Sequence, residues 1–192
     1  MVLTLVTATS MLALTLGDSA PAAAVKMKNL DGRELAINDM TGRNGTLVIF
    51  SCNHCPYVKA WEPRIAAVGN SCQGKGIGVI MINPNDPVAY PEDSFEVMQQ
   101  RAKERGFAFP YVVDATSDVA RAFGATRTPE AFLFDQAGKL VYHGVIDDNA
   151  EHADKVEKHY LQDALDALVA GKIPAVQETK AIGCSIKFRP KA

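Results

Sequence analysis

The sequence predicts an α/β fold in which a central mixed β-sheet is flanked by helices. Apolar runs alternate along the chain with amphipathic helical segments, the pattern of a sheet with helices on both faces. The runs at 46–50 and 77–82 are apolar at nearly every position, as expected of strands covered on both faces. A Cys-Asn-His-Cys motif at 52–55 follows the first of these strands and precedes a helix. These observations place two thiols where a strand gives way to a helix.

Length and composition describe one globular domain. The chain has 192 residues, of which 47% are apolar and 22% charged, close to ordinary globular values. A net charge of −2 and the lack of a polybasic run give no basis for binding nucleic acid or an anionic membrane. We expect a single domain over 1–192, acting as a monomer or weak dimer without a nucleic-acid partner.

The N-terminal residues 1–17 are uncharged and largely apolar. A secretory signal usually begins with basic residues, whereas the first lysine here is Lys26. The stretch is also shorter than the roughly 20 residues that a membrane-spanning helix needs. We therefore expect an uncleaved N-terminal arm at 1–13, no membrane span, and a cytoplasmic location in preference to a periplasmic or secreted one. A weak likeness to a cleavage site at 20–22 keeps secretion open as the alternative.

The elements follow from local signals. Asp31-Gly32 predicts the tight turn of an N-terminal β-hairpin over 28–35. Pro56 suits the first turn of a helix that starts near residue 55, and Pro63 inside that helix predicts a kink. Beyond these we expect, in order, a strand at 77–82, a proline-rich insertion around 83–93, a helix at 94–105, a strand at 111–113, a helix at 119–123, a hairpin of 131–134 with 140–143, an amphipathic helix at 154–170, and a tail over 172–192 packed on the domain.

The spacing of Cys52 and Cys55 is that of a thiol–disulfide exchange site, which needs a nucleophilic thiolate and a second thiol that resolves the mixed disulfide. A helix N-terminus carries partial positive charge and free N–H groups, and both favour a thiolate. We expect Cys52 to be the exposed nucleophile, with a pKa well below that of free cysteine. Cys55 is expected one turn inside the helix, as the shielded resolving thiol. His54 and Asn53 lie between them and are expected to tune how readily the disulfide is reduced, since a polar or protonated imidazole stabilises the reduced form.

A second candidate element is Thr128-Pro129, immediately before the strand at 131–134. A cis-proline at such a turn lacks an N–H and leaves neighbouring backbone groups free to pair with an extended peptide. Sequence alone does not assign the isomer. We expect Thr128 and Pro129 to line a groove for a protein dithiol or disulfide.

Metal and haem interpretations of the cysteines are weaker. A structural zinc needs two more nearby ligands, whereas Cys72 and Cys184 are isolated in the sequence. Haem attachment needs a histidine directly after the second cysteine, where Pro56 stands. We expect no metal and no cofactor. Cys72 is expected to be a passive thiol near a helix end, and Cys184 either a buried structural residue or a third redox thiol.

The order of strand, Cys-x-x-Cys and helix, followed by Thr128-Pro129 before a hairpin, resembles the thioredoxin superfamily. The likeness covers about residues 14–188 and narrows to thioredoxin-like and peroxiredoxin-like members of the alkyl hydroperoxide reductase/thiol-specific antioxidant (AhpC/TSA) family. The resemblance implies a thioredoxin-like fold, a cis Thr128-Pro129 bond and a thiol–disulfide oxidoreductase that exchanges its Cys52–Cys55 pair with protein partners. The segments that carry the narrower likeness are 16–21, 52–58, 83–93 and 180–187.

Departures from these relatives leave two alternatives open. Thioredoxin has a tryptophan directly before its first cysteine and a buried aspartate six residues before it, where this chain has Ser51 and Thr46. A peroxiredoxin has a proline, a threonine and an arginine where this chain has Val48, Cys52 and Pro129. Loss of those groups counts against efficient peroxide reduction, which needs donors for the leaving oxygen. An antioxidant hydroperoxide reductase and a non-catalytic binding module stand as the alternatives.

Overall fold

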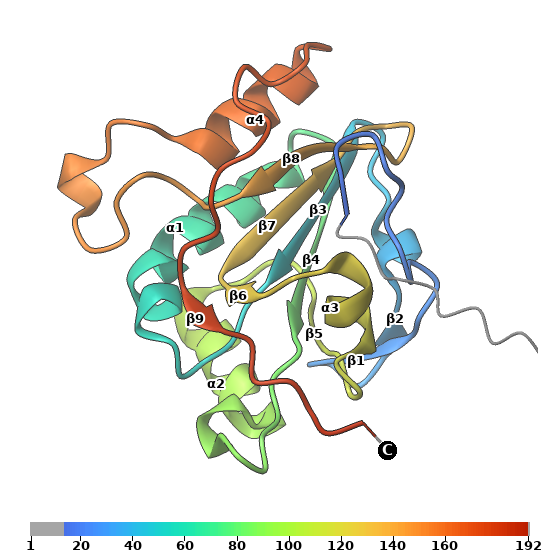
Figure 1. Ribbon diagram of the computed structural model, residues 1–192, viewed down its shortest axis with the longest axis vertical. Helices are drawn as coiled ribbons and strands as arrows, with labels where there is room; N and C mark the ends of the chain where they lie inside the picture. The colour runs from blue at the N-terminus through green and yellow to red at the C-terminus, as the bar shows by residue number, and fades with distance from the viewer. Residues whose placement is uncertain (1–13, 192) are drawn as a thin grey trace, which may run out of the picture.

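A seven-stranded mixed sheet forms the centre of the protein. The computed structural model describes residues 14–191, and the strands of its main sheet run in the order β2-β1-β5-β4-β3-β7-β8 (Figure 1). Strand β3 pairs parallel with β4 and antiparallel with β7. The prediction of a mixed sheet flanked by helices is confirmed. The strands are β1 (Met27–Asn29), β2 (Glu34–Leu35), β3 (Gly45–Phe50), β4 (Ile77–Asn83), β5 (Tyr111–Val113), β7 (Glu130–Phe134) and β8 (Leu140–Gly144), and a separate pair joins β6 (Arg127–Thr128) to β9 (Cys184–Ser185).

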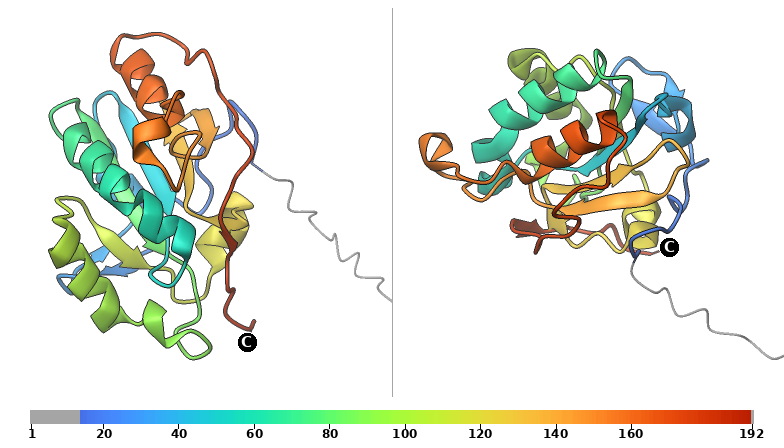
Figure 2. Two further views of the ribbon diagram at one scale, coloured as in Figure 1. Left: turned by 90° about the vertical axis from the view of Figure 1, so that its left-hand side faces the viewer. Right: turned by 90° about the horizontal axis from the view of Figure 1, so that it is seen from above.

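The helices lie on both faces of this sheet (Figure 2). Helices α1 (Pro56–Cys72), α2 (Phe95–Arg105) and α4 (Tyr160–Val169) cover one face, and α3 (Asp118–Phe123) covers the other. Side chains alternate along a strand, so Leu47 and Ile49 of β3 pack with α1 and α4, whereas Val48 and Phe50 pack with α3. This double coverage explains why most positions of β3 and β4 are apolar. Residues 14–191 also contain three short 3₁₀ helices: η1 (Ile37–Met40), η2 (Pro91–Asp93) and η3 (Ala153–Lys155).

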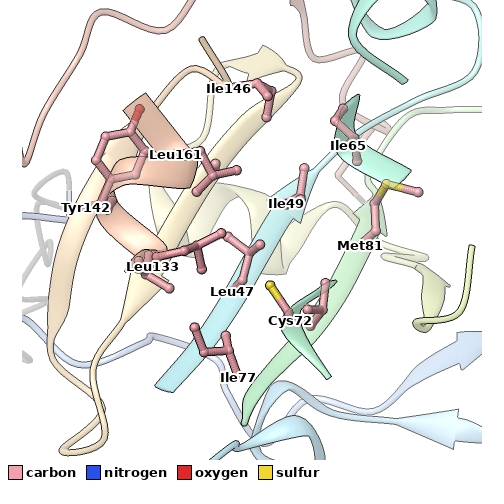
Figure 3. Close-up of a cluster of buried hydrophobic side chains, with 14 of the residues drawn as sticks. Leu47, Ile49, Ile65, Cys72, Ile77, Met81, Leu133, Tyr142, Ile146 and Leu161 are labelled. Atoms are coloured by element: carbon pink, nitrogen blue, oxygen red, sulfur yellow. The ribbon is translucent and has the colours of Figure 1, made fainter. Parts of the chain in front are cut away.

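The larger of the two main core clusters in residues 14–191 fills the space between the sheet and α1, α2 and α4. Figure 3 shows Leu47, Ile49 and Leu133 of the sheet gathered with Ile65 of α1 and Leu161 of α4, all of them buried. Burial of each such side chain contributes about 1.5–3 kcal/mol. These contacts hold α1 against β3 and β4, and so they fix the direction in which the helix leaves the cysteine motif.

Local signals mark the ends of several elements as predicted. Gly32 has φ of +86° in the turn between β1 and β2, a region that glycine enters without steric cost. The Ser94 hydroxyl accepts a hydrogen bond from the Val97 N–H at 3.4 Å and caps α2. Gly124 ends α3 with φ of +67°. Pro63 lies inside α1.

The helix predicted at 154–170 begins later than expected. Residues 153–155 form η3, and α4 starts only at Tyr160. The intervening backbone bonds elsewhere: the Glu157 N–H donates to Asp148 Oδ1 at 3.1 Å, and the Lys158 carbonyl accepts from the Asp148 N–H at 3.2 Å. Long-range pairing with the loop around Asp148 therefore replaces the first turns of the predicted helix.

Both ends of the described chain run along the hairpin of β7 and β8. The Gly17 N–H donates to the Leu140 carbonyl, and the Leu140 N–H donates to the Asp18 carbonyl, each at 2.9 Å. On the tail side, the Thr179 N–H donates to the His143 carbonyl at 3.0 Å. The predicted arm at 1–13 lies outside the described residues. Within residues 14–191, no helix has the length and apolar character needed to cross a membrane.

The close approach of β4 to η1 gives a test of the fold. A Cβ on Gly78 would lie 1.5 Å from the Met40 carbonyl oxygen, so the backbone must shift in Gly78→Ala. We expect this variant to lose about 1–3 kcal/mol of unfolding free energy in urea titrations, because overpacking costs about that much. Gly74→Ala is the control, since its nearest neighbour is 3.7 Å away. Equal unfolding midpoints for the two variants would contradict the contact.

Candidate functional site

The two thiols stand at the carboxyl end of β3 and at the start of α1. The Ser51 N–H still donates to the Ile82 carbonyl at 2.8 Å, so the sheet reaches to the residue before Cys52. Cys55 is the N-cap of α1, and Pro56 is its first helical residue. The helix start is as predicted, but Cys55 is not one turn inside it. Cys55, rather than Cys52, occupies the helix mouth.

Thr128 contacts both thiols. The Cys52 Sγ lies 3.1 Å from Thr128 Oγ1, and the Cys55 thiol donates to the Thr128 carbonyl at 3.3 Å. The Thr128-Pro129 peptide bond is cis. Cys52 and Cys55 are free thiols with 1% and 0% of their surface exposed. The structure thus joins the two predicted motifs, but it buries Cys52, which we expected to be exposed.

The thiols titrate as a pair that shares a proton. The pKa of Cys55 is lowered to about 5, first by the Cys52 thiol and then by Cys184 and the Val58 N–H, against the opposing effect of burial. The pKa of Cys52 is raised by its hydrogen bond to Cys55, by burial and by the Asp93 carboxylate. Because the two sulfurs share one proton and the Cys55 thiol donates to the Thr128 carbonyl, these directions describe the pair and not either thiol alone. The expectation that Cys52 carries the lower pKa stays a prediction.

Asp93, which the sequence analysis did not single out, anchors the loop between the cysteines. Its carboxylate accepts hydrogen bonds from the backbone N–H groups of Asn53 at 2.6 Å and His54 at 3.3 Å, and from Asn85 Nδ2 at 2.8 Å. The side chain is fully buried. A buried carboxylate is tolerated when donors surround it in this way. The available signal was an acidic residue at the end of the 83–93 insertion, but nothing local connects it to a motif 40 residues earlier.

His54 and Asn53 are both held by this insertion. His54 Nδ1 lies 2.6 Å from Asp93 Oδ2, and the ring stacks on Tyr90 with centroids 5.0 Å apart. Asn53 donates to the Glu92 carbonyl at 2.9 Å and accepts from the Tyr111 hydroxyl at 3.1 Å. Asn53 is buried, whereas the His54 side chain is 17% exposed. His54 is thus the one of the two that reaches solvent.

One group of donor atoms at the site has metal-binding geometry. Ligand atoms of Cys52, His54 and Asp93 all lie within 4.8 Å of one another. The Asp93 oxygens and His54 Nδ1 are already engaged in the hydrogen bonds described above. An ion at this place would have to displace those bonds, so the arrangement fits a hydrogen-bonded loop anchor better than a metal centre.

The predicted groove beside Pro129 is occupied by the chain's own tail. Strand β9 pairs antiparallel with β6 and sets Cys184 opposite Thr128. Glu130, next to Pro129, holds the segment that leads into Thr128. Its carboxylate accepts from the backbone N–H groups of Thr126 and Arg127 at 2.9 Å and lies 2.6 Å from His143 Nε2. The expectation of a free backbone edge at Thr128 is wrong for this arrangement.

The two remaining cysteines have different surroundings. Cys184 packs against the cluster formed by Cys52, Cys55 and Val58. Cys72 lies at the far end of α1 in the larger core cluster (Figure 3), and burial raises its pKa to about 11. The interpretation of Cys72 as a passive thiol agrees with this place.

The chain resembles one protein family and several proteins of known structure. The model of the AhpC/TSA family matches residues 16–143. The crystal structure of an uncharacterized conserved protein from Geobacillus kaustophilus is 38% identical, covers 93% of this chain and 95% of its own, and has a TM-score of 0.86. The thioredoxin domain of a thiol-disulfide oxidoreductase from Bacteroides vulgatus is 23% identical over 69% of this chain and 90% of its own, with a TM-score of 0.57. This last likeness confirms the thioredoxin-like fold.

A curated relative carries a functional name. Thiol-disulfide oxidoreductase ResA from Halalkalibacterium halodurans is 25% identical over 116 residues, which are 60% of this chain and 61% of that protein. The match therefore spans less than two thirds of the relative's length.

The shared proton predicts a low thiolate midpoint. Absorbance of the reduced protein at 240 nm should rise by one thiolate with a midpoint near pH 5, because the pKa of Cys55 is lowered to about 5. Cys52→Ala should raise that midpoint, since it removes the first cause of the lowering. Cys72→Ala is the control and should leave the curve unchanged below pH 9. A midpoint of 8–9 in the unaltered protein, as for free cysteine, would contradict the arrangement.

Proposed function

The chain belongs to the AhpC/TSA family, and on that premise we propose that it is a thiol–disulfide oxidoreductase that exchanges its Cys52–Cys55 dithiol with a protein partner. The observation that carries the proposal is the contact of both thiols with Thr128, beside Pro129. Two cysteines at a strand end and a helix N-cap, with a hydroxyl and a carbonyl against their sulfurs, suit a reaction in which each sulfur in turn becomes a thiolate.

Proton transfer between the two sulfurs makes Cys52 the attacking group. When the proton moves from Cys52 to Cys55, the Cys55 thiol donates to the Thr128 carbonyl at 3.3 Å, as observed. The Thr128 hydroxyl, 3.1 Å away, then donates to the Cys52 thiolate. The Cys52 thiolate attacks one sulfur of a partner disulfide, and the other partner sulfur leaves as a thiolate. The Cys55 thiolate, after losing its proton, attacks Cys52 Sγ, releases the partner as a dithiol and leaves a Cys52–Cys55 disulfide.

The partner is an extended protein segment that replaces β9. The thiols are buried, and Cys184, paired with Thr128, packs on them, so a partner must pair with Thr128 in the place of Cys184 to reach them. Main-chain hydrogen bonds of this kind give affinity without demanding a particular sequence. We keep the expectation that the protein works as a monomer or weak dimer.

His54 favours the thiolate form of the cysteine pair, and Asp93 opposes that effect. His54 lies between the two cysteines in the sequence, and an imidazole that carries a proton there stabilises a nearby thiolate. The Asp93 carboxylate acts in the opposite sense, because its charge raises the pKa of Cys52. The two side chains are hydrogen-bonded at 2.6 Å, so their effects on the thiolate oppose each other.

Trapping a partner tests the proposal. In Cys55→Ala the mixed disulfide on Cys52 should persist, because the thiol that resolves it is absent, and non-reducing gels followed by mass spectrometry should identify the trapped protein. Cys72→Ala is the matched control, since Cys72 is also buried on α1 but far from Thr128, and it should trap nothing. A trap that works with Cys52→Ala instead would reverse the roles of the two thiols.

Kinetics separate this function from its rivals. We expect the reduced protein to react faster with a protein disulfide such as insulin than with hydrogen peroxide in stopped-flow measurements. Fast oxidation by peroxide with slow disulfide exchange would establish a hydroperoxide reductase instead. A pair that forms no disulfide with either oxidant would indicate a non-catalytic binding module.

Opposite shifts in redox potential test the roles of His54 and Asp93. We expect His54→Ala to lower the midpoint potential of the Cys52–Cys55 disulfide, and Asp93→Asn to raise it, each by tens of millivolts in equilibrium with glutathione. About 30 mV corresponds to tenfold in the exchange constant of this two-electron couple. His152→Ala, at an exposed histidine in a surface loop, is the control and should not shift the potential. Shifts of the same sign would show that the two side chains act only by holding the loop.

A further inference from the structure

Strand β9 lies across the site as a partner segment would. Figure 1 shows β9 beside β6, near the start of α1. The Ile186 N–H donates to the Thr126 carbonyl at 3.0 Å, and Arg127 Nη1 donates to the Gly183 carbonyl at 3.2 Å. The register sets Cys184 opposite Thr128. A cysteine in an extended segment is thereby presented to the dithiol.

Residues on both sides of Cys184 fix its position. Gly183 has φ of +152°, and a Cβ there would lie 2.2 Å from the Thr128 carbonyl oxygen, so only glycine allows this approach. Ile186 is buried in the core cluster on the α3 face of the sheet. The Lys187 N–H donates to Asn85 Oδ1 at 2.8 Å, which joins the tail to the insertion that carries Asp93. The tail is therefore held at the site by its close approach to Thr128, by the core on the α3 face and by a hydrogen bond to the insertion.

The Cys184 side chain meets Cys55 rather than Cys52. It packs on the cluster formed by Cys52, Cys55 and Val58, and Cys55 is the thiol of that cluster whose presence raises the pKa of Cys184. Cys52 instead has Thr128 Oγ1 at 3.1 Å. Burial and the neighbouring Cys55 raise the pKa of Cys184 to about 11, while Lys187 and Arg127 oppose that rise. Once Cys55 is part of a disulfide it carries no charge, and that contribution to the raised pKa disappears.

We propose that Cys184 is a third redox thiol of this site, which takes over the disulfide by bonding to Cys55. The inference rests on the proposed function, since exchange with a partner must first form the Cys52–Cys55 disulfide. The Cys184 thiolate then attacks Cys55 Sγ, the S–S bond to Cys52 breaks as the bond between Cys55 and Cys184 forms, and Cys52 leaves as a thiolate. The proton lost by Cys184 balances the one that Cys52 can take up, and no further oxidant or reductant is consumed.

The transfer changes what the oxidised protein can do. A Cys55–Cys184 disulfide fastens β9 over Thr128 and closes the edge on which a partner would pair. It also returns Cys52 to the thiolate form, next to the Thr128 hydroxyl. The oxidised protein therefore exists in two forms, one with the tail free to leave and one with the tail covalently held.

Tryptic peptides of the full chain distinguish these two forms. The protein is equilibrated with mixtures of reduced and oxidised glutathione, quenched with acid, blocked with N-ethylmaleimide and digested without reduction. The peptide 44–59 holds Cys52 and Cys55, 181–187 holds Cys184, and 65–75 holds Cys72. We expect the unaltered protein to yield both the internally bridged peptide 44–59 and a peptide 44–59 linked to 181–187.

Three variants assign the linkage. Cys52→Ser should yield the linked peptide in most molecules, because Cys55 and Cys184 are then the pair at the site. Cys55→Ser should yield at least tenfold less of it, and Cys184→Ser should yield none while keeping the internal bridge. Peptide 65–75 should appear unlinked throughout, as an internal control for random oxidation. Circular dichroism checks that each variant folds, and the linked peptide of the unaltered protein does not depend on any variant.

The outcomes separate this inference from the function on which it rests. An internal Cys52–Cys55 bridge without any linked peptide, in the unaltered protein and in a folded Cys52→Ser variant, would overturn the role of Cys184 and leave thiol–disulfide exchange intact. Linkage that survives Cys55→Ser would overturn the assignment to Cys55. A protein that forms neither disulfide at any glutathione ratio would overturn the proposed function as well.

Discussion

The antiparallel register between β3 and β7 determines where the chemistry of this protein takes place. Thr46 pairs with Phe134 and Phe50 with Glu130, so each step forward on β3 matches a step back on β7. Two further steps bring Cys52 opposite Thr128, where the sulfur lies 3.1 Å from the threonine hydroxyl. A shift of one residue would turn every side chain of β3 to the other face of the sheet. The packing of Leu47 and Ile49 on one face and of Val48 and Phe50 on the other excludes that shift.

Around this register, segments distant in sequence supply the groups that the motif lacks. Thr46 stands where thioredoxin has its buried aspartate, and in this protein a buried carboxylate enters from the insertion at Asp93. The two carboxylates are not equivalent, because Asp93 is bound to the loop between the cysteines through backbone N–H groups. Asp93 therefore has two effects: it fixes the shape of the loop through hydrogen bonds, and its charge raises the pKa of the Cys52 thiol.

The sequence predicted those features that local signals determine. Apolar runs located β3 and β4, Asp31-Gly32 located the first hairpin, and the Cys-x-x-Cys spacing together with Thr128-Pro129 located the two halves of the site. The burial of Cys52, the anchoring role of Asp93 and the late start of α4 were not predictable in this way. Each depends on a residue outside its own segment: Cys184 packs on the cluster that contains Cys52, Asp93 accepts from the Asn53 N–H, and Asp148 accepts from the Glu157 N–H.

The tail links the titration of the thiols to access by a partner. Cys184 supplies two of the contacts that lower the pKa of Cys55, one from its side chain and one from its backbone N–H. Those contacts exist only while β9 is paired with β6. In the proposed mechanism, a partner segment that takes the place of β9 removes these contacts, which favours the form with the proton on Cys55 and the thiolate on Cys52. The step that opens the site is thus also the step that favours the attacking form of the nucleophile.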